Sequence, residues 1–214
     1  MPADRGFVIA LLGAECTGKT TLALALREAL AAEGRDAVVV PEYLREFCDR
    51  AQRTPRADEQ RAIATEQTRR IEGAARTHAF VIADTTALMT AVYSDQVFAD
   101  TGLYPTAQNA HSAGCDLTLL TALDLPWRAD GLQRDGPHVR EPVDAKVRAA
   151  LSRAGVDHAV VFGMGDARSM AALAAVHRAL APPPVDENSA PRWHWRCDRC
   201  GDTSCERRPL LPRT

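Results

Sequence analysis

The chain alternates short runs of apolar residues with longer segments in which apolar residues recur every three or four positions. Short apolar runs are typical of strands buried on both faces, and the longer periodicity is typical of helices. The runs predict strands at residues 7–12, 37–40, 79–84, 116–121 and 158–163. The segments predict helices at residues 19–33, 56–78, 86–99, 105–113, 143–154 and 167–180; the second is polar, with Gln60 and Gln67 expected on its surface. This alternation predicts an α/β fold with a five-stranded parallel sheet flanked by helices.

A glycine-rich loop follows the first predicted strand and reads Gly13-Ala-Glu-Cys-Thr-Gly-Lys-Thr20. A strand before this pattern and a helix after it form the context of a P-loop. The glycines permit positive φ angles, and the N–H groups of the loop and the helix N-terminus form a nest for phosphate. We expect Lys19 to reach the β- and γ-phosphates of ATP and Thr20 to hold Mg²⁺. The predicted ATP site comprises Gly13, Glu15, Cys16, Thr17, Gly18, Lys19, Thr20 and Thr21.

Two carboxylates follow predicted strands. Asp84 ends the third strand in a Walker B pattern, in which the carboxylate reaches Mg²⁺ directly or through water. Glu42 follows the second strand, which places it at the ligand edge of an α/β sheet. We expect both strands beside the first, so Glu42 and Asp84 are the two candidates for the base that accepts the proton of an acceptor hydroxyl. We favour Glu42, whose alternative role is that of an acid at a helix N-terminus.

Three further side chains are candidates for substrate binding. Tyr43 and Trp127 offer aromatic faces on which a planar base would stack, although core packing explains either residue equally well. Arg45 either binds the substrate or pairs with Glu42 or Glu46. The sequence does not separate these alternatives.

A polar segment at residues 122–135 lies between the fourth strand and the next helix. A mobile lid occupies such a place in phosphotransferases, and its arginines neutralise the transferred phosphoryl group. Arg128, Arg134 and Arg140 flank the Pro126-Trp127 turn, and we take Arg134 and Arg140 as candidate catalytic residues. The alternative is a solvated loop whose arginines contact nothing.

The C-terminal part of the chain differs from the rest. We divide the chain into a kinase-like domain at residues 1–181, a proline-rich linker at 182–192 and a cysteine-rich tail at 193–214. Within the tail, Cys197-x-x-Cys200-Gly resembles a zinc knuckle, with Cys205 and His194 as further candidate ligands. Structural Zn²⁺, reduced thiols in a docked tail and redox chemistry are the three alternatives.

Composition limits the partners. Of 214 residues, 46% are hydrophobic and 25% charged, and the net charge of −2 gives no basic field that would favour nucleic acid. No apolar stretch approaches the roughly 18–20 residues of a membrane helix, and no signal peptide precedes the first strand. We therefore expect a cytoplasmic protein without a membrane partner. The oligomeric state stays open, a homo-oligomer included.

Four motifs in the same order resemble the ribosylnicotinamide kinase domain of the NadR family, over residues 7–180. They are Gly13–Thr21, Pro41–Glu46, Asp84-Thr85-Thr86 and Asp124-Leu-Pro-Trp-Arg-Ala-Asp-Gly131. Cys16 departs from the serine common in that family, Gln133-Arg134 departs from the usual arginine position, and the cysteine-rich tail is outside the pattern. The resemblance implies a P-loop nucleoside or nucleotide kinase fold, of the kind grouped with AAA-type ATPases, with a lid.

The same resemblance implies a reaction. It is the ATP- and Mg²⁺-dependent phosphorylation of the 5′-hydroxyl of nicotinamide riboside, which gives nicotinamide mononucleotide. Two alternatives remain open: a kinase for another nucleoside or small hydroxyl compound, and a regulatory nucleotide-binding ATPase. A kinase would require a small-molecule nucleoside as its partner, whereas a regulatory ATPase would hydrolyse ATP without an acceptor.

Overall fold

The computed structural model describes residues 5–127 and 136–181. The chain divides into two units, Met1–Leu180 and Ala181–Thr214. All the helices and strands described below belong to the first unit. The predicted linker, the cysteine-rich tail and the candidate zinc ligands Cys197, Cys200, Cys205 and His194 lie outside the described residues.

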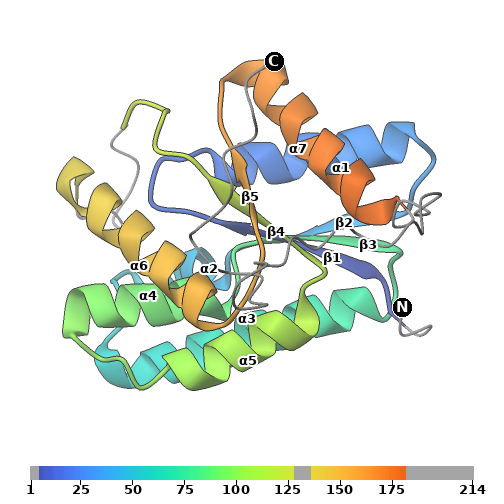
Figure 1. Ribbon diagram of the computed structural model, residues 1–214. Coiled ribbons are helices and arrows are strands. Elements are labelled where there is room, and N and C mark those ends of the chain that lie inside the picture. The colour runs from blue at the N-terminus through green and yellow to red at the C-terminus, as the bar shows by residue number, and fades with distance from the viewer. Residues whose placement is uncertain (1–4, 128–135, 182–214) are drawn as a thin grey trace, which may run out of the picture. The chain divides into compact units, whose positions relative to one another are not determined.

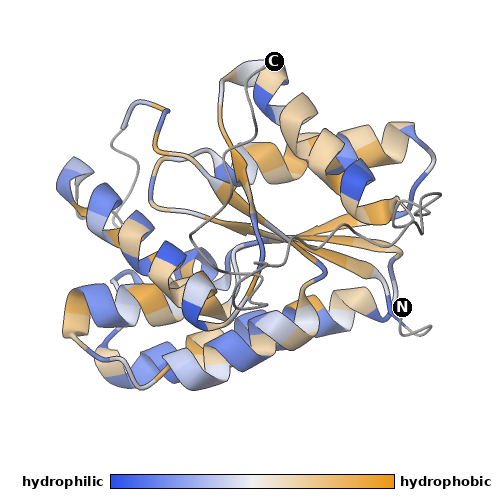
Figure 2. Ribbon diagram, in the orientation of Figure 1, coloured by the Kyte–Doolittle hydropathy of each residue, from blue (hydrophilic) through white to orange (hydrophobic). Residues whose placement is uncertain are grey.

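The sheet confirms the predicted α/β class. Five strands pair in parallel in the order β2-β3-β1-β4-β5. Their bounds are β1 Phe7–Leu12, β2 Ala37–Val40, β3 Phe80–Asp84, β4 Leu117–Thr121 and β5 Ala159–Val161. The three central strands are almost entirely buried, whereas the edge strands β2 and β5 are partly exposed. Figure 2 shows this apolar sheet at the centre of the first unit.

The strand order corrects one expectation. β3 lies beside β1, as expected for the strand that ends in Asp84, but β2 lies at the edge of the sheet and pairs only with β3 among the described strands. Glu42 therefore does not follow a neighbour of β1. Because β2 is in register with β3, with Val40 opposite Ala83, the segment after β2 still emerges next to Asp84.

Helices cover both faces of the sheet (Figure 1). α1 and α7 pack on one face, and α3, α4, α5 and α6 on the other. α4 lies between α3, α5 and α6, so almost every residue of its first two turns is buried, and this helix lacks a polar face. The bounds are α1 Lys19–Ala32, α2 Tyr43–Ala51, α3 Gln60–Ala75, α4 Ala87–Phe98, α5 Tyr104–Gly114, α6 Arg140–Arg153 and α7 Gly165–Leu180, with single 3₁₀ turns at Ala57–Glu59 and Pro137–Val139.

Several helices differ from their predicted form. α2 was not predicted, although its apolar residues Tyr43, Leu44, Phe47, Cys48 and Ala51 recur at helical spacing; Cys48 is its only buried residue. α6 begins at Arg140, three residues before the expected start, because Pro137 opens a 3₁₀ turn that leads into it. Gln60 and Gln67 of α3 were expected on the surface but are buried, at 4% and 1% exposure. Within the described residues, no helix has both the length and the apolar character that crossing a bilayer requires.

Candidate active site

The P-loop has the backbone that its glycines predict. Gly13 has a φ angle of 146° and Gly18 one of 76°, both in the region that favours glycine. Gly13 also has no room for a side chain, because a Cβ there would lie 2.1 Å from Thr121 Oγ1 at the end of β4. Cys16 adopts the left-handed region too, with a φ angle of 53° despite its side chain. The loop is therefore held in a tightly turned form against β4.

The Lys19 side chain lies against the backbone of this loop. Its Nζ donates hydrogen bonds to the carbonyl oxygens of Gly13, at 2.8 Å, and Ala14, at 2.9 Å. The side chain is buried, so its charge acts in a medium that screens it less than water does. The predicted phosphate-binding lysine thus lies on the P-loop itself, where a phosphate held by the loop would meet it.

The N-terminus of α1 opens onto the same loop. Gly18 is its N-cap, no described side chain caps it, and its first turn contains no acidic residue. The first N–H groups of a helix lack partners within the helix, and the helix dipole gives this end a partial positive charge. An anion is the ligand that such an end favours.

Thr20 and Asp84 meet at the end of the central strands, as the sequence predicts for a magnesium site. Thr20 Oγ1 donates to Asp84 Oδ2 at 2.5 Å, and Asp84 is 2% exposed. The register that sets Leu11 of β1 opposite Asp84 of β3 brings the carboxylate to the base of the P-loop. Burial is the main cause that raises the pKa of Asp84, against the lowering effects of the Thr20 hydroxyl and the Lys19 charge.

This pair fits Mg²⁺. Asp84 Oδ1 is buried and has no hydrogen-bond partner among the described residues, so one carboxylate oxygen is left for a cation. Hydroxyl and carboxylate oxygens are the hard ligands that Mg²⁺ prefers, and in nucleotide sites phosphates and water supply the rest. The described part of the chain holds no group of three His, Cys, Asp or Glu residues that would bind a metal without a nucleotide.

Glu42 follows β2, which lies on the opposite side of β3 and Asp84 from β1 and the P-loop. It is the N-cap residue of α2, yet its side chain does not cap that helix. Instead Glu42 Oε2 accepts a hydrogen bond from Arg45 Nε at 2.7 Å. Of the two expectations for Arg45, pairing with Glu42 is the one that the geometry shows. The carboxylate thus pairs with a side chain of α2 and not with the backbone of that helix, and 15% of the Glu42 side chain is exposed.

Gln67 accepts the hydrogen bond at the start of α2 that Glu42 does not, a role that sequence reasoning did not predict. Its Oε1 accepts a hydrogen bond from the Tyr43 N–H at 2.7 Å, in the first turn of α2. Its Nε2 lies 3.4 Å from the carbonyl oxygens of Pro41 and Thr85. One buried amide on α3 therefore joins the segments that leave β2 and β3, next to both candidate carboxylates.

A small pocket, of about 10 Å³, opens beside these residues. Thr85 has a φ angle of 87°, and its buried hydroxyl has no hydrogen-bond partner among the described residues. Tyr93 on α4 adds an aromatic ring that sequence reasoning missed. The pocket is lined by Glu42, Leu44, Ile63, Gln67, Thr85, Met89, Thr90 and Tyr93. It therefore combines one carboxylate, one unpaired hydroxyl and apolar walls.

Tyr43 lies elsewhere. Arg70 covers one face of its ring, 4.4 Å from the centroid, and its hydroxyl accepts a hydrogen bond from Arg50 at 3.0 Å. Tyr43 is not among the residues that line the pocket with Glu42. Arg50 also lies over this ring, 6.0 Å from its centroid, so two guanidinium groups already contact the ring on which a planar base would stack.

The predicted lid arginines divide into two cases. Arg140 is not a loop residue: it begins α6, is 8% exposed and donates to the Leu123 carbonyl oxygen at 3.2 Å. This guanidinium supports the loop after β4, and its role in neutralising a transferred phosphoryl group stays a prediction. Arg128 and Arg134 lie outside the described residues, and Trp127, half-buried, is the last described residue before them.

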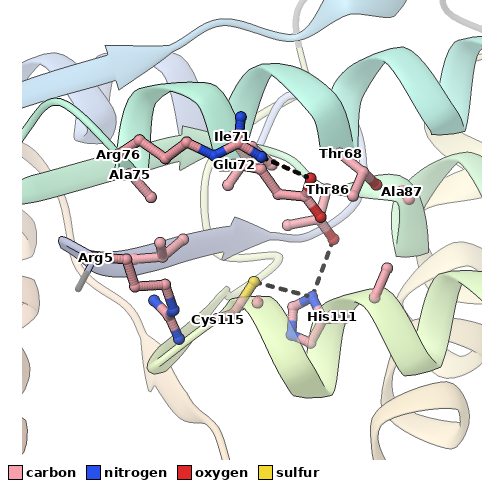
Figure 3. Close-up of a pocket in the computed structure, with 13 residues that line it drawn as sticks. Arg5, Thr68, Ile71, Glu72, Ala75, Arg76, Thr86, Ala87, His111 and Cys115 are labelled. Carbon is pink, nitrogen blue, oxygen red and sulfur yellow. Dashed lines mark hydrogen bonds and ion pairs between the residues drawn. The ribbon is translucent and has the colours of Figure 1, made fainter. Parts of the chain in front are cut away.

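A second cavity, of about 370 Å³, lies between α3 and α5 (Figure 3). Within it His111 bonds Thr86 Oγ1 through Nδ1 at 3.0 Å and Thr118 Oγ1 through Nε2 at 2.9 Å. Burial lowers the pKa of His111 to about 4, so the ring is neutral near pH 7. None of the P-loop residues and neither candidate carboxylate lines this cavity. It is separate from the site described above.

The P-loop, the 2-3-1-4-5 parallel sheet and the Thr20–Asp84 pair define a P-loop NTPase domain with a kinase-like fold. The chain belongs to the AAA domain family, whose profile matches residues 8–168. Among curated proteins, none matches the chain.

Two solved structures resemble it. A crystal structure of NadR protein in complex with NR has a TM-score of 0.67 and 21% identity, and the match covers 81% of this chain and 51% of that one. NadR protein in complex with NAD and AMP-PNP has a TM-score of 0.63 and 20% identity, covering 83% of this chain and 50% of that one. The chain thus spans about half the length of these structures. The resemblance to the NadR kinase domain is confirmed at the level of the fold.

Proposed function

We propose that this chain is an ATP- and Mg²⁺-dependent kinase that phosphorylates the 5′-hydroxyl of nicotinamide riboside. The observation that carries the proposal is the position of Asp84, between a P-loop on one side and a pocket with a second carboxylate, Glu42, on the other. A phosphoryl donor and a hydroxyl acceptor need such adjoining sites. The two NadR structures, one in complex with NR and one with AMP-PNP, support this choice of ligands.

The donor side would neutralise charge. Phosphoryl transfer depends mainly on positioning and on electrostatic stabilisation of the phosphate oxygens. The P-loop N–H groups and Lys19 would bind the β- and γ-phosphates, and Thr20 and Asp84 would hold Mg²⁺, which supplies positive charge to the phosphates when bound. Arg134 and Arg140 remain our candidates for further cations on the transferred group, and Arg140 also supports the loop after β4.

Glu42 is our choice of base. One oxygen of Asp84 accepts from Thr20, and the other is the one that fits Mg²⁺, so neither oxygen is left for a substrate proton. Glu42 lines the pocket and is oriented by Arg45. In this scheme the Glu42 carboxylate takes the proton of the acceptor 5′-hydroxyl. The hydroxyl oxygen forms a bond to the γ-phosphorus of ATP, the bond from that phosphorus to the β,γ-bridging oxygen breaks, and ADP leaves.

The charge of the pocket favours a cationic acceptor. Nicotinamide riboside carries a positive pyridinium ring, and the described lining contains the Glu42 carboxylate and the Tyr93 ring. Arg45, which pairs with Glu42 at 2.7 Å, offsets part of that negative charge but does not line the pocket. A carboxylate and an aromatic face both attract a flat cation. A neutral nucleoside would gain neither attraction.

The test is an acceptor panel with Mg²⁺-ATP, in which ADP release is followed for nicotinamide riboside, its neutral dihydro form, uridine and adenosine. We expect nicotinamide riboside to give the highest kcat/KM, and the dihydro form to fall below it because it lacks the charge. Equal rates for all four would overturn the choice of acceptor, and ADP release that no acceptor stimulates would favour a regulatory ATPase instead.

A further inference from the structure

Arg168 is a buried cation that none of the sequence motifs includes. It lies in the first turns of α7, and 5% of its surface is exposed. A buried charge costs free energy unless it is paired and hydrogen-bonded. Its partners therefore show which segments it serves.

These partners come from three loops that meet at the P-loop. Arg168 Nη2 donates to the Thr17 carbonyl oxygen at 2.8 Å, inside the P-loop itself. Nη1 donates to Asp124 Oδ1, after β4, and to the Gly163 carbonyl oxygen, after β5, both at 2.9 Å. Asp124 Oδ2 in turn accepts the Gly163 N–H at 2.5 Å. A planar guanidinium can serve three acceptors at once, which a lysine ammonium on a single flexible stem cannot do in this geometry.

The bond to Thr17 has a consequence for phosphate binding. A trans peptide is planar, so its C=O and the N–H of the next residue point in opposite directions. Because Arg168 holds the Thr17 carbonyl, the Gly18 N–H must point away from Arg168. Gly18 is the N-cap of α1, where N–H groups form the nest for phosphate. The Thr17 side chain is held as well, with its hydroxyl 2.7 Å from that of Thr121.

We propose that Arg168, oriented by Asp124, is a positioning residue for nucleoside di- and triphosphates: it fixes the Thr17–Gly18 peptide so that the Gly18 N–H faces a bound phosphate. The same guanidinium ties this peptide to the loops after β4 and β5. The inference concerns nucleotide binding alone and does not depend on the acceptor. A binding measurement therefore tests it separately from the proposed kinase reaction.

The experiment compares dissociation constants of Mg²⁺-ADP and of inorganic tripolyphosphate, measured by calorimetry on the full chain. Arg168→Met should weaken both ligands by a similar factor, roughly 10- to 100-fold, because the change acts on the phosphate nest that they share. Arg178→Met is the matched control, since Arg178 lies exposed on the same helix, and it should leave both constants unchanged.

Two further variants separate positioning from folding. Asp124→Asn keeps the shape of the side chain and an acceptor for the Gly163 N–H, and should weaken both ligands by a smaller factor, roughly 3- to 10-fold. Arg168→Lys should not restore affinity. The proposal is overturned if folded Arg168 and Asp124 variants bind both ligands like the control, or if only ADP is weakened, because the effect would then lie at the base and not at the phosphates.

Discussion

The two sides of the candidate site are built differently. On the donor side, the P-loop is held by β4, by the loops that follow β4 and β5, and by its own Lys19, and nearly every link is a short hydrogen bond. On the acceptor side, Glu42 and Thr85 sit on segments that leave β2 and β3, joined by one glutamine. Thr85 has a positive φ angle and an unpaired hydroxyl within the described residues.

This difference separates polyphosphate binding, which is common to many nucleotides, from the choice of acceptor, which would be particular to this chain. The donor side uses mostly backbone groups, which suit any polyphosphate and do not depend on side-chain identity. The acceptor side of the proposed reaction uses side chains from α2, α3 and α4, and these would determine which hydroxyl compound fits. Variants on the donor side should therefore affect every acceptor alike, whereas variants on the acceptor side should distinguish among acceptors.

The largest effect is expected at the junction of the two sides. Asp84→Asn should lower kcat roughly a thousandfold and raise the Mg²⁺ concentration needed for half-maximal rate, because a neutral amide binds the cation poorly. Initial rates over a Mg²⁺ titration measure this. Asp116→Asn, at the opposite end of the sheet, is the control. An unchanged Mg²⁺ requirement would show that Asp84 does not hold the metal.

Glu42→Gln should come next, with kcat lowered roughly a hundredfold and KM for ATP unchanged, because the amide cannot take the acceptor proton. Glu46→Gln on the same helix removes an exposed carboxylate of the same size and should have little effect. Steady-state kinetics with both substrates varied makes the measurement. If Glu42→Gln keeps the full rate, the base lies elsewhere.

Gln67 gives a sharper comparison between the two sides. Gln67→Leu should raise KM for the acceptor roughly tenfold and leave KM for ATP unchanged, because it releases the start of α2 but touches no part of the P-loop. Gln60→Leu also removes a buried amide of α3 and serves as the control for lost stability. A rise in both Michaelis constants would show that Gln67 is not confined to the acceptor side.

The smallest expected effect is on stability, and it arises at His111, which belongs to neither side of the candidate site. The pKa of His111 is lowered by burial from the usual 6.5 to about 4, so between these pH values the unfolded state binds a proton that the folded state does not. The contribution of His111 to the free energy of unfolding should therefore stay constant above pH 6.5 and fall by roughly 3 kcal/mol as the pH drops to 4.

Denaturant unfolding at pH 7.0, 6.0 and 5.0 tests this slope. Glu59 and Glu66, whose pKa values are lowered from 4.5 to about 2, lose their stabilising effect mainly below pH 4.5, so this range stays above their contribution. His111→Gln should flatten the slope, whereas His158→Gln, at a half-buried position, should keep it. The same slope in both variants would assign the pH dependence to another group.

Local sequence predicts the donor side well and the acceptor side poorly. The P-loop, the central strands and the Thr20–Asp84 pair follow from contiguous motifs and from the parallel sheet, which aligns strand ends. Gln67 and Arg168 do not, because a polar residue reveals its burial only through partners distant in sequence. α2 was missed for a different reason: Leu44, Phe47, Cys48 and Ala51 recur at helical spacing, so the local sequence contained a signal that the prediction did not use.

The central claim is that a phosphoryl group passes from the donor side to a hydroxyl on the acceptor side. Its most direct test is the mass of the nucleoside after incubation with Mg²⁺-ATP. We predict that nicotinamide riboside becomes one phosphate heavier, and that neither its 5′-deoxy analogue nor the Lys19→Ala variant gives a product. ADP formation by the unaltered chain without any change in the mass of nicotinamide riboside would contradict the claim.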